Sequence, residues 1–194
     1  MTIKSGLSFL KQYRSKPRAV GAVLPSSKYL AEKMVHNIDF DSARCIVEYG
    51  AGTGVFTDEI LKFRKPDTTL LLFENNEEFY KQLNEKYSGE TNVHIVNDSA
   101  EYVGKYLLEH NIVCADYIIS GLPFASLPKE VSTKILEQTR KYLKPNGSFT
   151  TFQYTMLKRD FIGQFFADIV IERELRNIPP AYVFCCSNNV SESE

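Results

Sequence analysis

The stretch CIVEYGAGTGVFTDEILKFR, residues 45–64, decides the fold. Its first residues are apolar and β-branched, which predicts a buried strand ending near Tyr49. Gly50, Gly52 and Gly54 then predict a tight turn that brings backbone close to a ligand. The remainder predicts a helix whose first N–H groups are free at that turn. A strand, a glycine turn and a helix in this order predict an α/β domain.

The same alternation continues along the chain. Apolar runs predict strands at 68–74, 92–97, 115–120 and about 148–155, the last entered through a turn at KPNG. Amphipathic patterns predict helices between them, and a further helix at about 156–166 precedes two final strands, 169–177 and 181–187, that pair as an antiparallel hairpin. Near-continuous apolar strands alternating with such helices indicate a mostly parallel sheet covered on both faces. We therefore expect a Rossmann-like three-layer α/β/α sandwich with seven strands.

Composition narrows the class of protein. The chain has 194 residues, is 43% apolar and carries a net charge of −1, which does not favour a stable nucleic-acid partner. It contains no apolar run of about 20 residues that would span a bilayer, and no signal-peptide core. Its four cysteines lack CxxC spacing, so we expect reduced, mostly buried thiols, no metal site and a cytoplasmic location.

The N-terminal region is basic. Residues 1–36 contain Lys4, Lys11, Arg14, Lys16, Arg18, Lys28 and Lys33 against one acid, Glu32. A solvated basic face and attraction to an anionic surface both fit this pattern. An amphipathic helix through Ile3, Leu7 and Leu10 would lie on a membrane or pack over the mouth of the site, and the sequence leaves both open. A second helix begins after the N-capping serines that follow Pro25.

Acidic residues follow the predicted strands at the same edge as the glycine turn. Glu74 ends the second strand, 20 residues after Gly54, where a carboxylate accepts the hydroxyls of a ribose. Asp98 follows the third strand and suits either an adenine amino group or a helix N-cap. A dinucleotide fingerprint requires glycine at position 55, which is Val55, and a phosphate-binding loop would require Gly-Lys-Ser/Thr, which is missing.

These motifs resemble those of the class I S-adenosylmethionine-dependent methyltransferases over about residues 44–186. The resemblance implies the strand order 3-2-1-4-5-7-6 with strand 7 antiparallel. We therefore expect a methyltransferase domain at 37–188, preceded by an N-terminal helical cap or membrane-contact segment at 1–36 and followed by a disordered tail at 189–194. The residues that the resemblance assigns to S-adenosylmethionine are Glu48, Gly50, Ala51, Gly52, Gly54, Glu74, Asn75, Asp98, Ser99 and Ser120.

The turn after the fourth strand, Gly121-Leu122-Pro123-Phe124, would meet the methyl acceptor. Amino-methylating relatives carry Asn-Pro-Pro-Tyr or Asn-Leu-Pro-Tyr there, and the Asn helps a conjugated base amine present its lone pair. Gly121 removes that group, which favours an aliphatic amine, and Phe124 is the aromatic expected to contact the acceptor. These four residues are the predicted catalytic turn, acting by proximity and orientation with no evident general base.

A wider resemblance involves KPRAVGAVLPSSKYLAEKM, SGLPF and IPPAYVF, which are similar to segments of bacterial phospholipid N-methyltransferases, relatives of the rRNA adenine dimethyltransferases. It implies methylation of phosphatidylethanolamine or a related phospholipid, with peripheral contact at the inner membrane face. It also implies that Pro25, Ser26 and Ser27 close over the cofactor, while Tyr13 either boxes the amine or simply packs. An rRNA adenine N6-methyltransferase, a small-molecule amine methyltransferase and a non-catalytic binder remain alternatives.

Overall fold

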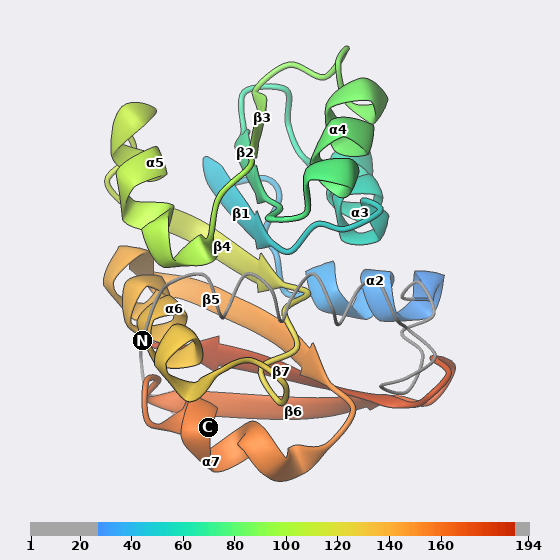
Figure 1. Cartoon of the computed structure of the whole chain (residues 1–194), viewed down its shortest axis with the longest axis vertical. Helices are drawn as coiled ribbons and strands as arrows, with labels where there is room; N and C mark the ends of the chain where they lie inside the picture. Colours follow the sequence, from blue (N-terminus) through green and yellow to red (C-terminus); the bar gives the residue numbers. More distant parts are fainter. Residues whose placement is uncertain (1–26, 189–194) are drawn as a thin grey trace.

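Seven strands form one sheet in the order β3-β2-β1-β4-β5-β7-β6, in a computed structural model that describes residues 27–188 (Figure 1). Neighbouring strands are parallel except where β7 pairs with β5 and β6. The predicted strand order and the antiparallel strand are confirmed. The strands are β1 (Cys45–Tyr49), β2 (Thr69–Phe73), β3 (Val93–Val96), β4 (Ala115–Ser120), β5 (Leu143–Gln153), β6 (Asp168–Glu174) and β7 (Ala181–Ser187).

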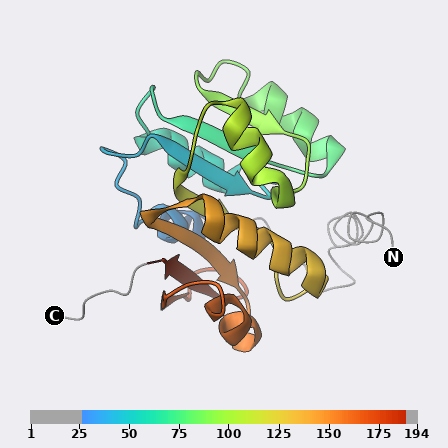
Figure 2. The same ribbon diagram turned by 90° about the vertical axis from the view of Figure 1, so that its left-hand side faces the viewer.

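Helices cover both faces of this sheet. The first face packs against α2 (Lys28–Val35), α3 (Val55–Phe63) and α4 (Glu77–Lys86) through residues such as Met34, Ile60 and Leu83. The second face packs against α5 (Val103–Glu109), α6 (Lys129–Tyr142) and α7 (Arg159–Gly163). Figure 2 shows α5 and α6 in front of the strands that they cover. The buried apolar side chains on each face form the two halves of the core.

Two segments differ from the sequence prediction. The KPNG segment belongs to β5, which begins at Leu143 and shifts its register against β4 between Ala115 and Tyr117. A Cβ at Gly147 would lie 2.4 Å from the backbone oxygen of Asp116, so this irregular pairing requires glycine. The helix predicted at 156–166 is divided into a 3-10 turn, η2 (Met156–Lys158), and the short α7.

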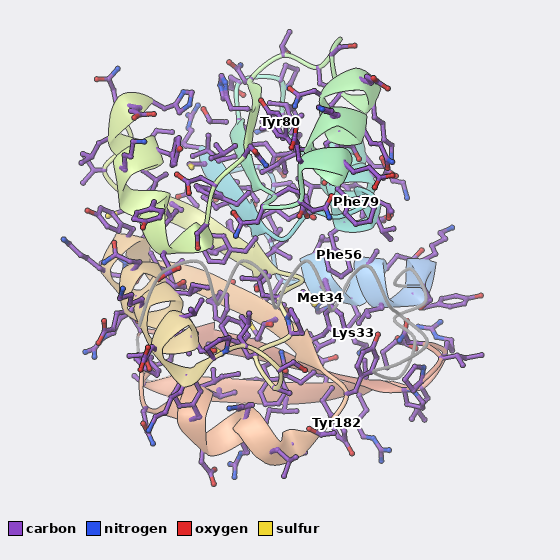
Figure 3. All side chains as sticks on the ribbon, in the orientation of Figure 1. Lys33, Met34, Phe56, Phe79, Tyr80 and Tyr182 are labelled. Atoms are coloured by element: carbon purple, nitrogen blue, oxygen red, sulfur yellow. The ribbon has the colours of Figure 1, made fainter. Side chains whose placement is uncertain are left out.

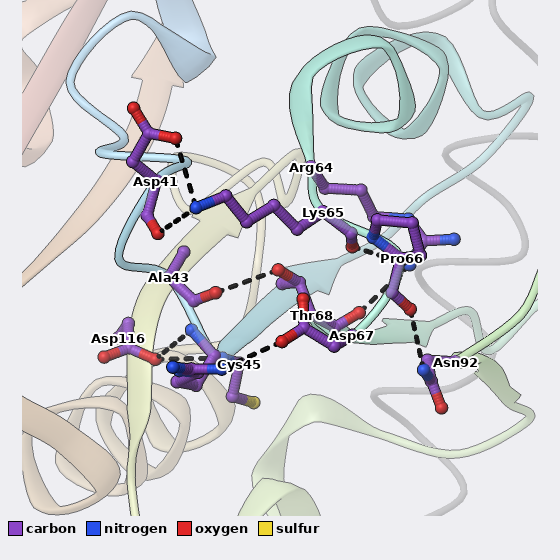
Figure 4. Close-up of polar contacts among 11 residues, drawn as sticks. Asp41, Ala43, Cys45, Arg64, Lys65, Pro66, Asp67, Thr68, Asn92 and Asp116 are labelled. Carbon is purple, nitrogen blue, oxygen red and sulfur yellow. Dashed lines mark hydrogen bonds and ion pairs between the residues drawn. The ribbon is translucent and has the colours of Figure 1, made fainter.

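The amino ends of the central strands are closed by polar contacts (Figure 4). The Asp116 carboxylate accepts hydrogen bonds from the backbone N–H groups of Arg44 and Cys45, both at 2.9 Å. The Thr68 hydroxyl donates to the Ala43 carbonyl oxygen at 2.8 Å. These bonds hold the strands in register at one edge of the sheet, while the predicted site residues follow the carboxyl ends at the other.

The first described residues and helix α2 are bonded to the β6–β7 hairpin. The Ser27 side chain caps α2 by accepting a hydrogen bond from Leu30 N, as the N-capping serine predicts. The Ser27 N–H donates to Asn177 Oδ1 at 2.9 Å, and Lys33 forms an ion pair with Glu172 of β6. Helix α2 therefore lies against the β6–β7 hairpin, where Figure 3 labels Lys33 and Met34.

Candidate functional site

Backbone hydrogen bonds tie the carboxyl ends of four strands together. They run between neighbouring strands in the sheet: Gly121 N donates to Tyr49 O at 2.8 Å, Gly50 N to Phe73 O at 2.7 Å, and Glu74 N to Val96 O at 3.0 Å. The segments that follow β4, β1, β2 and β3 are thus held side by side. All the described residues that the sequence assigned to the cofactor lie in these segments or at the strand ends.

The glycine turn after β1 requires its glycines. Gly50, Gly52 and Gly54 have φ angles of 69°, 59° and 81°, in the left-handed region that side chains disfavour. A Cβ at Gly54 would also lie 2.1 Å from the hydroxyl of Tyr87, the residue that ends α4. That hydroxyl lies 3.0 Å from Gly54 O and 2.8 Å from Asp58 Oδ1. The third glycine therefore makes room for a tyrosine that braces the turn.

Glu48 is the buried acid beneath this turn. Its Oε2 accepts a hydrogen bond from the Thr57 hydroxyl at 2.7 Å, and its Oε1 has no partner among residues 27–188. Burial raises the pKa of Glu48 to about 8, with a smaller contribution from the charge of Glu74. At neutral pH the ligand-free protein therefore holds Glu48 as a neutral acid with one buried oxygen unpaired, which is unusual in a folded protein. An ammonium group of bound S-adenosylmethionine beside this oxygen would supply the donor and favour the ionised carboxylate.

Glu74 supports the backbone around the pocket. Its Oε2 accepts from Gly52 N and its Oε1 from Asn76 N, both at 2.8 Å, and the residue is buried. Asn76 caps α4, whereas Asn75 is partly exposed between the two. Glu74 thus fixes the glycine turn to the end of β2. Its contact with a ribose stays a prediction.

The sequence left two roles open for Asp98, contact with an adenine amino group and capping of the helix that follows. Ser99 caps the 3-10 turn η1 (Ala100–Tyr102), because its hydroxyl accepts from Glu101 N at 3.3 Å. Asp98 Oδ2 accepts a hydrogen bond from the Tyr106 hydroxyl at 2.8 Å. The capping residue is therefore Ser99, and Tyr106 orients the Asp98 carboxylate, whose predicted ligand is adenine.

The acceptor turn packs directly on the glycine turn. A Cβ at Gly121 would lie 3.0 Å from the carbonyl oxygen of Gly50, so a side chain there would be tightly packed against the glycine turn. Phe124 is fully buried, and its ring meets Phe149 edge-on at 6.3 Å. The sequence predicted that the Phe124 ring contacts the methyl acceptor. The structure places the ring in the core instead.

Gln153, which sequence reasoning missed, braces the acceptor turn. It ends β5 and is buried; its side-chain amide donates to Leu122 O at 3.4 Å and accepts from Ala125 N at 3.3 Å. Ser120, the last residue of β4, accepts from Leu122 N through its hydroxyl at 3.2 Å. The signal for Gln153 was available: it is the polar residue that ends an apolar strand at the site edge.

Some predicted residues fall outside the described part of the chain. Tyr13, Pro25 and Ser26 lie there, and Ser27 is described only as the cap of α2. Within residues 27–188, no group of three or more His, Cys, Asp or Glu side chains is arranged to hold a metal ion. Over the same range, no helix is long and apolar enough to cross a membrane.

The sheet order, the glycine turn and the acids after the next two strands define an S-adenosylmethionine-dependent methyltransferase, as predicted. When bound, S-adenosylmethionine supplies an electrophilic methyl group on sulfur. Residues 24–169 match the ribosomal RNA adenine dimethylase family, and the chain belongs to this family of methyltransferases.

One curated relative matches nearly the whole chain. It is the ornithine lipid N-methyltransferase of Singulisphaera acidiphila, 31% identical over 192 residues, which cover 98% of this chain and 100% of the relative.

Solved structures confirm the fold. A SAM-dependent methyltransferase from Aquifex aeolicus superposes with a TM-score of 0.62 at 17% identity, covering 89% of this chain and 96% of that one. An rRNA methylase from Streptococcus thermophilus gives a TM-score of 0.60 at 16% identity, covering 82% and 95%. At these identities the likeness concerns the fold alone.

Proposed function

We propose that the protein methylates the aliphatic amine of a lipid headgroup, in phosphatidylethanolamine or a related amino lipid, with S-adenosylmethionine as methyl donor. The observation that carries this proposal is the make-up of the acceptor turn. Position 121 has no side chain, a Cβ there would lie 3.0 Å from Gly50 O, and the Phe124 ring is buried. The turn thus offers neither an amide side chain nor an aromatic face to a planar base.

An aliphatic amine makes different demands on the site. Its lone pair is already directed, so it needs no help in rehybridising, but it must lose the proton that it carries below a pKa of about 10. Among residues 27–188 no donor occupies the Gly121 carbonyl oxygen, whereas Ser120, Leu122 and Pro123 carbonyls each accept a hydrogen bond. Gly121 O is our candidate for orienting the amine by accepting its N–H. The amine reacts as its neutral fraction, whose proton has gone to solvent. Its nitrogen attacks the methyl carbon in line while the C–S bond breaks, S-adenosylhomocysteine leaves, and the new ammonium releases a proton to solvent.

The curated relative supports the same acceptor class. Its name assigns N-methylation of ornithine lipid, and it matches this chain along nearly its entire length. An amine on a lipid headgroup is the chemistry that the acceptor turn favours on independent grounds.

The alternative acceptor is an adenine of ribosomal RNA. The description of the matched family favours it. A flipped base needs hydrogen bonds to its polar edge and a stacking surface, which the turn at 121–124 lacks. A small soluble amine is the third acceptor that the experiment below separates.

The test uses purified protein and methyl-labelled S-adenosylmethionine, with products identified by mass. Parallel reactions contain vesicles with phosphatidylethanolamine, micelles with ornithine lipid, undermethylated ribosomal RNA, or free ethanolamine. We expect label in a lipid amine, abolished by Gly52→Val because Gly52 has a positive φ. Gly89→Ala is the matched control, since a Cβ there has no atom within 4 Å. Label in adenine, or in free ethanolamine alone, would overturn the proposal.

A further inference from the structure

Three large aliphatic side chains project into solvent from the segments that follow β5 and β6. Leu157 lies in η2, after β5, and is 84% exposed, while Leu175 and Ile178 follow β6 and are 65% and 75% exposed. A single exposed aliphatic residue is ordinary on a protein surface. These three follow two strands that are separated in the sheet only by β7.

Both segments lie at the edge of the sheet that carries the site. β5 and β6 run in the same direction, because each is antiparallel to β7 between them. Their carboxyl ends, Gln153 and Glu174, therefore meet the edge at which β1 and β4 also end. Gln153 itself bonds to the acceptor turn. The exposed aliphatic side chains thus rise from the edge through which a methyl acceptor must arrive.

Basic side chains accompany these aliphatic residues. Lys158 and Arg159 follow Leu157, and Arg176 stands between Leu175 and Ile178. Asp160, 4.0 Å from Arg159, and Glu174, 3.0 Å from Arg176, offset part of this charge. Glu174 is itself buried, so the Arg176 guanidinium forms the outer part of that pair.

The basic N-terminal segment joins the chain at the same place. Residues 1–26 include five basic residues and no acid: Lys4, Lys11, Arg14, Lys16 and Arg18. Residue 27, where this segment enters α2, is hydrogen-bonded to Asn177 between Leu175 and Ile178. The most positive part of the sequence is therefore attached beside the exposed aliphatic residues.

We propose that Leu157, Lys158, Arg159, Leu175, Arg176 and Ile178 form an apolar–basic rim that docks on an anionic lipid membrane and presents the site edge to its headgroups. This inference rests on the proposed lipid acceptor. Aliphatic side chains beside cations suit a membrane interface, where the former enter the acyl boundary and the latter meet anionic headgroups. A nucleic acid would match the cations but would leave the three aliphatic side chains unburied.

The test measures partition onto vesicles of phosphatidylcholine and phosphatidylglycerol by co-sedimentation, without any amine lipid. We expect the triple variant Leu157→Ser/Leu175→Ser/Ile178→Ser to bind at least about tenfold more weakly than wild type, since burying such side chains contributes more than that in total. The control is Val113→Ser, because Val113 is 77% exposed but precedes β4 at the opposite edge. The control should bind like wild type.

Two further measurements distinguish failure of this inference from failure of the proposed function. Binding of S-adenosylhomocysteine should be equal in all three proteins, which shows that the rim variant is folded. Methylation of vesicle-borne amine lipid by the triple variant should fall at least about tenfold, in line with its membrane binding. If the wild type methylates lipid and the triple variant binds and methylates equally well, the rim inference is wrong and the proposed function stands. If wild type binds vesicles through the rim but methylates only RNA, the proposed function fails and the rim stands.

Discussion

Replacing Glu48 by Gln should remove the pH dependence of stability that this residue imposes on the ligand-free protein. Folded Glu48 keeps its proton up to about pH 8, whereas an unfolded glutamate loses it near 4.5. The folded state thus binds more protons between these values, and its free energy of unfolding falls as the pH rises through them. Each pH unit in that window costs up to about 1.4 kcal/mol, so the whole decrease is on the order of 3–5 kcal/mol.

Glu48→Gln removes this decrease and can still accept the Thr57 hydrogen bond through its amide oxygen. The assay is urea unfolding of both proteins without ligand, at one-unit steps from pH 5 to pH 9. Taking the difference between the two proteins cancels every other titrating group. The variant should gain stability relative to wild type with each step up to about pH 8. A difference that stays constant with pH would refute the reasoning.

Three other outcomes follow from the packing around the site. Phe124→Ala should lower the free energy of unfolding by about 3–5 kcal/mol, because it empties a core position; a ring that faced the acceptor would instead change KM with little loss of stability in urea. Gly54→Ala should be strongly destabilising in wild type and less so in a Tyr87→Phe background, which removes the oxygen 2.1 Å from the new Cβ; additive effects in a double-mutant cycle would contradict this contact. The ring centroids of His94 and His110 lie 4.0 Å apart with the rings tilted by 40°, and burial followed by the charge of His110 lowers the pKa of His94. Stability should therefore fall as pH drops below about 6.5, and His110→Asn should raise the His94 pKa in an NMR titration.

The fold was predictable because its signals are local. A glycine turn between a buried strand and a helix, repeated apolar strands and a final hairpin indicated the sheet, and its order is confirmed. The errors arose where pairing between distant segments decides the outcome. KPNG reads as a turn, but its pairing with β4 makes it the start of β5. The single helix expected after β5 is split into η2 and α7.

The sequence predicted which candidate residues lie at the carboxyl ends of the strands, near the glycine turn. The resemblance assigned Glu48 to the cofactor, and the spacing after Gly54 assigned Glu74. The structure places both buried acids beside the glycine turn, and their contacts with the cofactor stay predictions. Tyr87 was missed because it acts through contacts with residues about 30 positions away, which no local pattern reveals. The position of Gln153 at the end of an apolar strand was visible in the sequence, but its contact with Leu122, 31 positions away, was not. The motif containing Phe124 likewise carries no information about the side to which its ring turns.

The attachment of α2 to the β6–β7 hairpin has a consequence for the order of events during synthesis. Ser27 and Lys33 find their partners 150 and 139 residues later, in the last part of the sheet to leave the ribosome. Helix α2 is therefore made long before the hairpin to which it binds. During elongation it would lack these two partners, and only the completed β6–β7 hairpin would supply them.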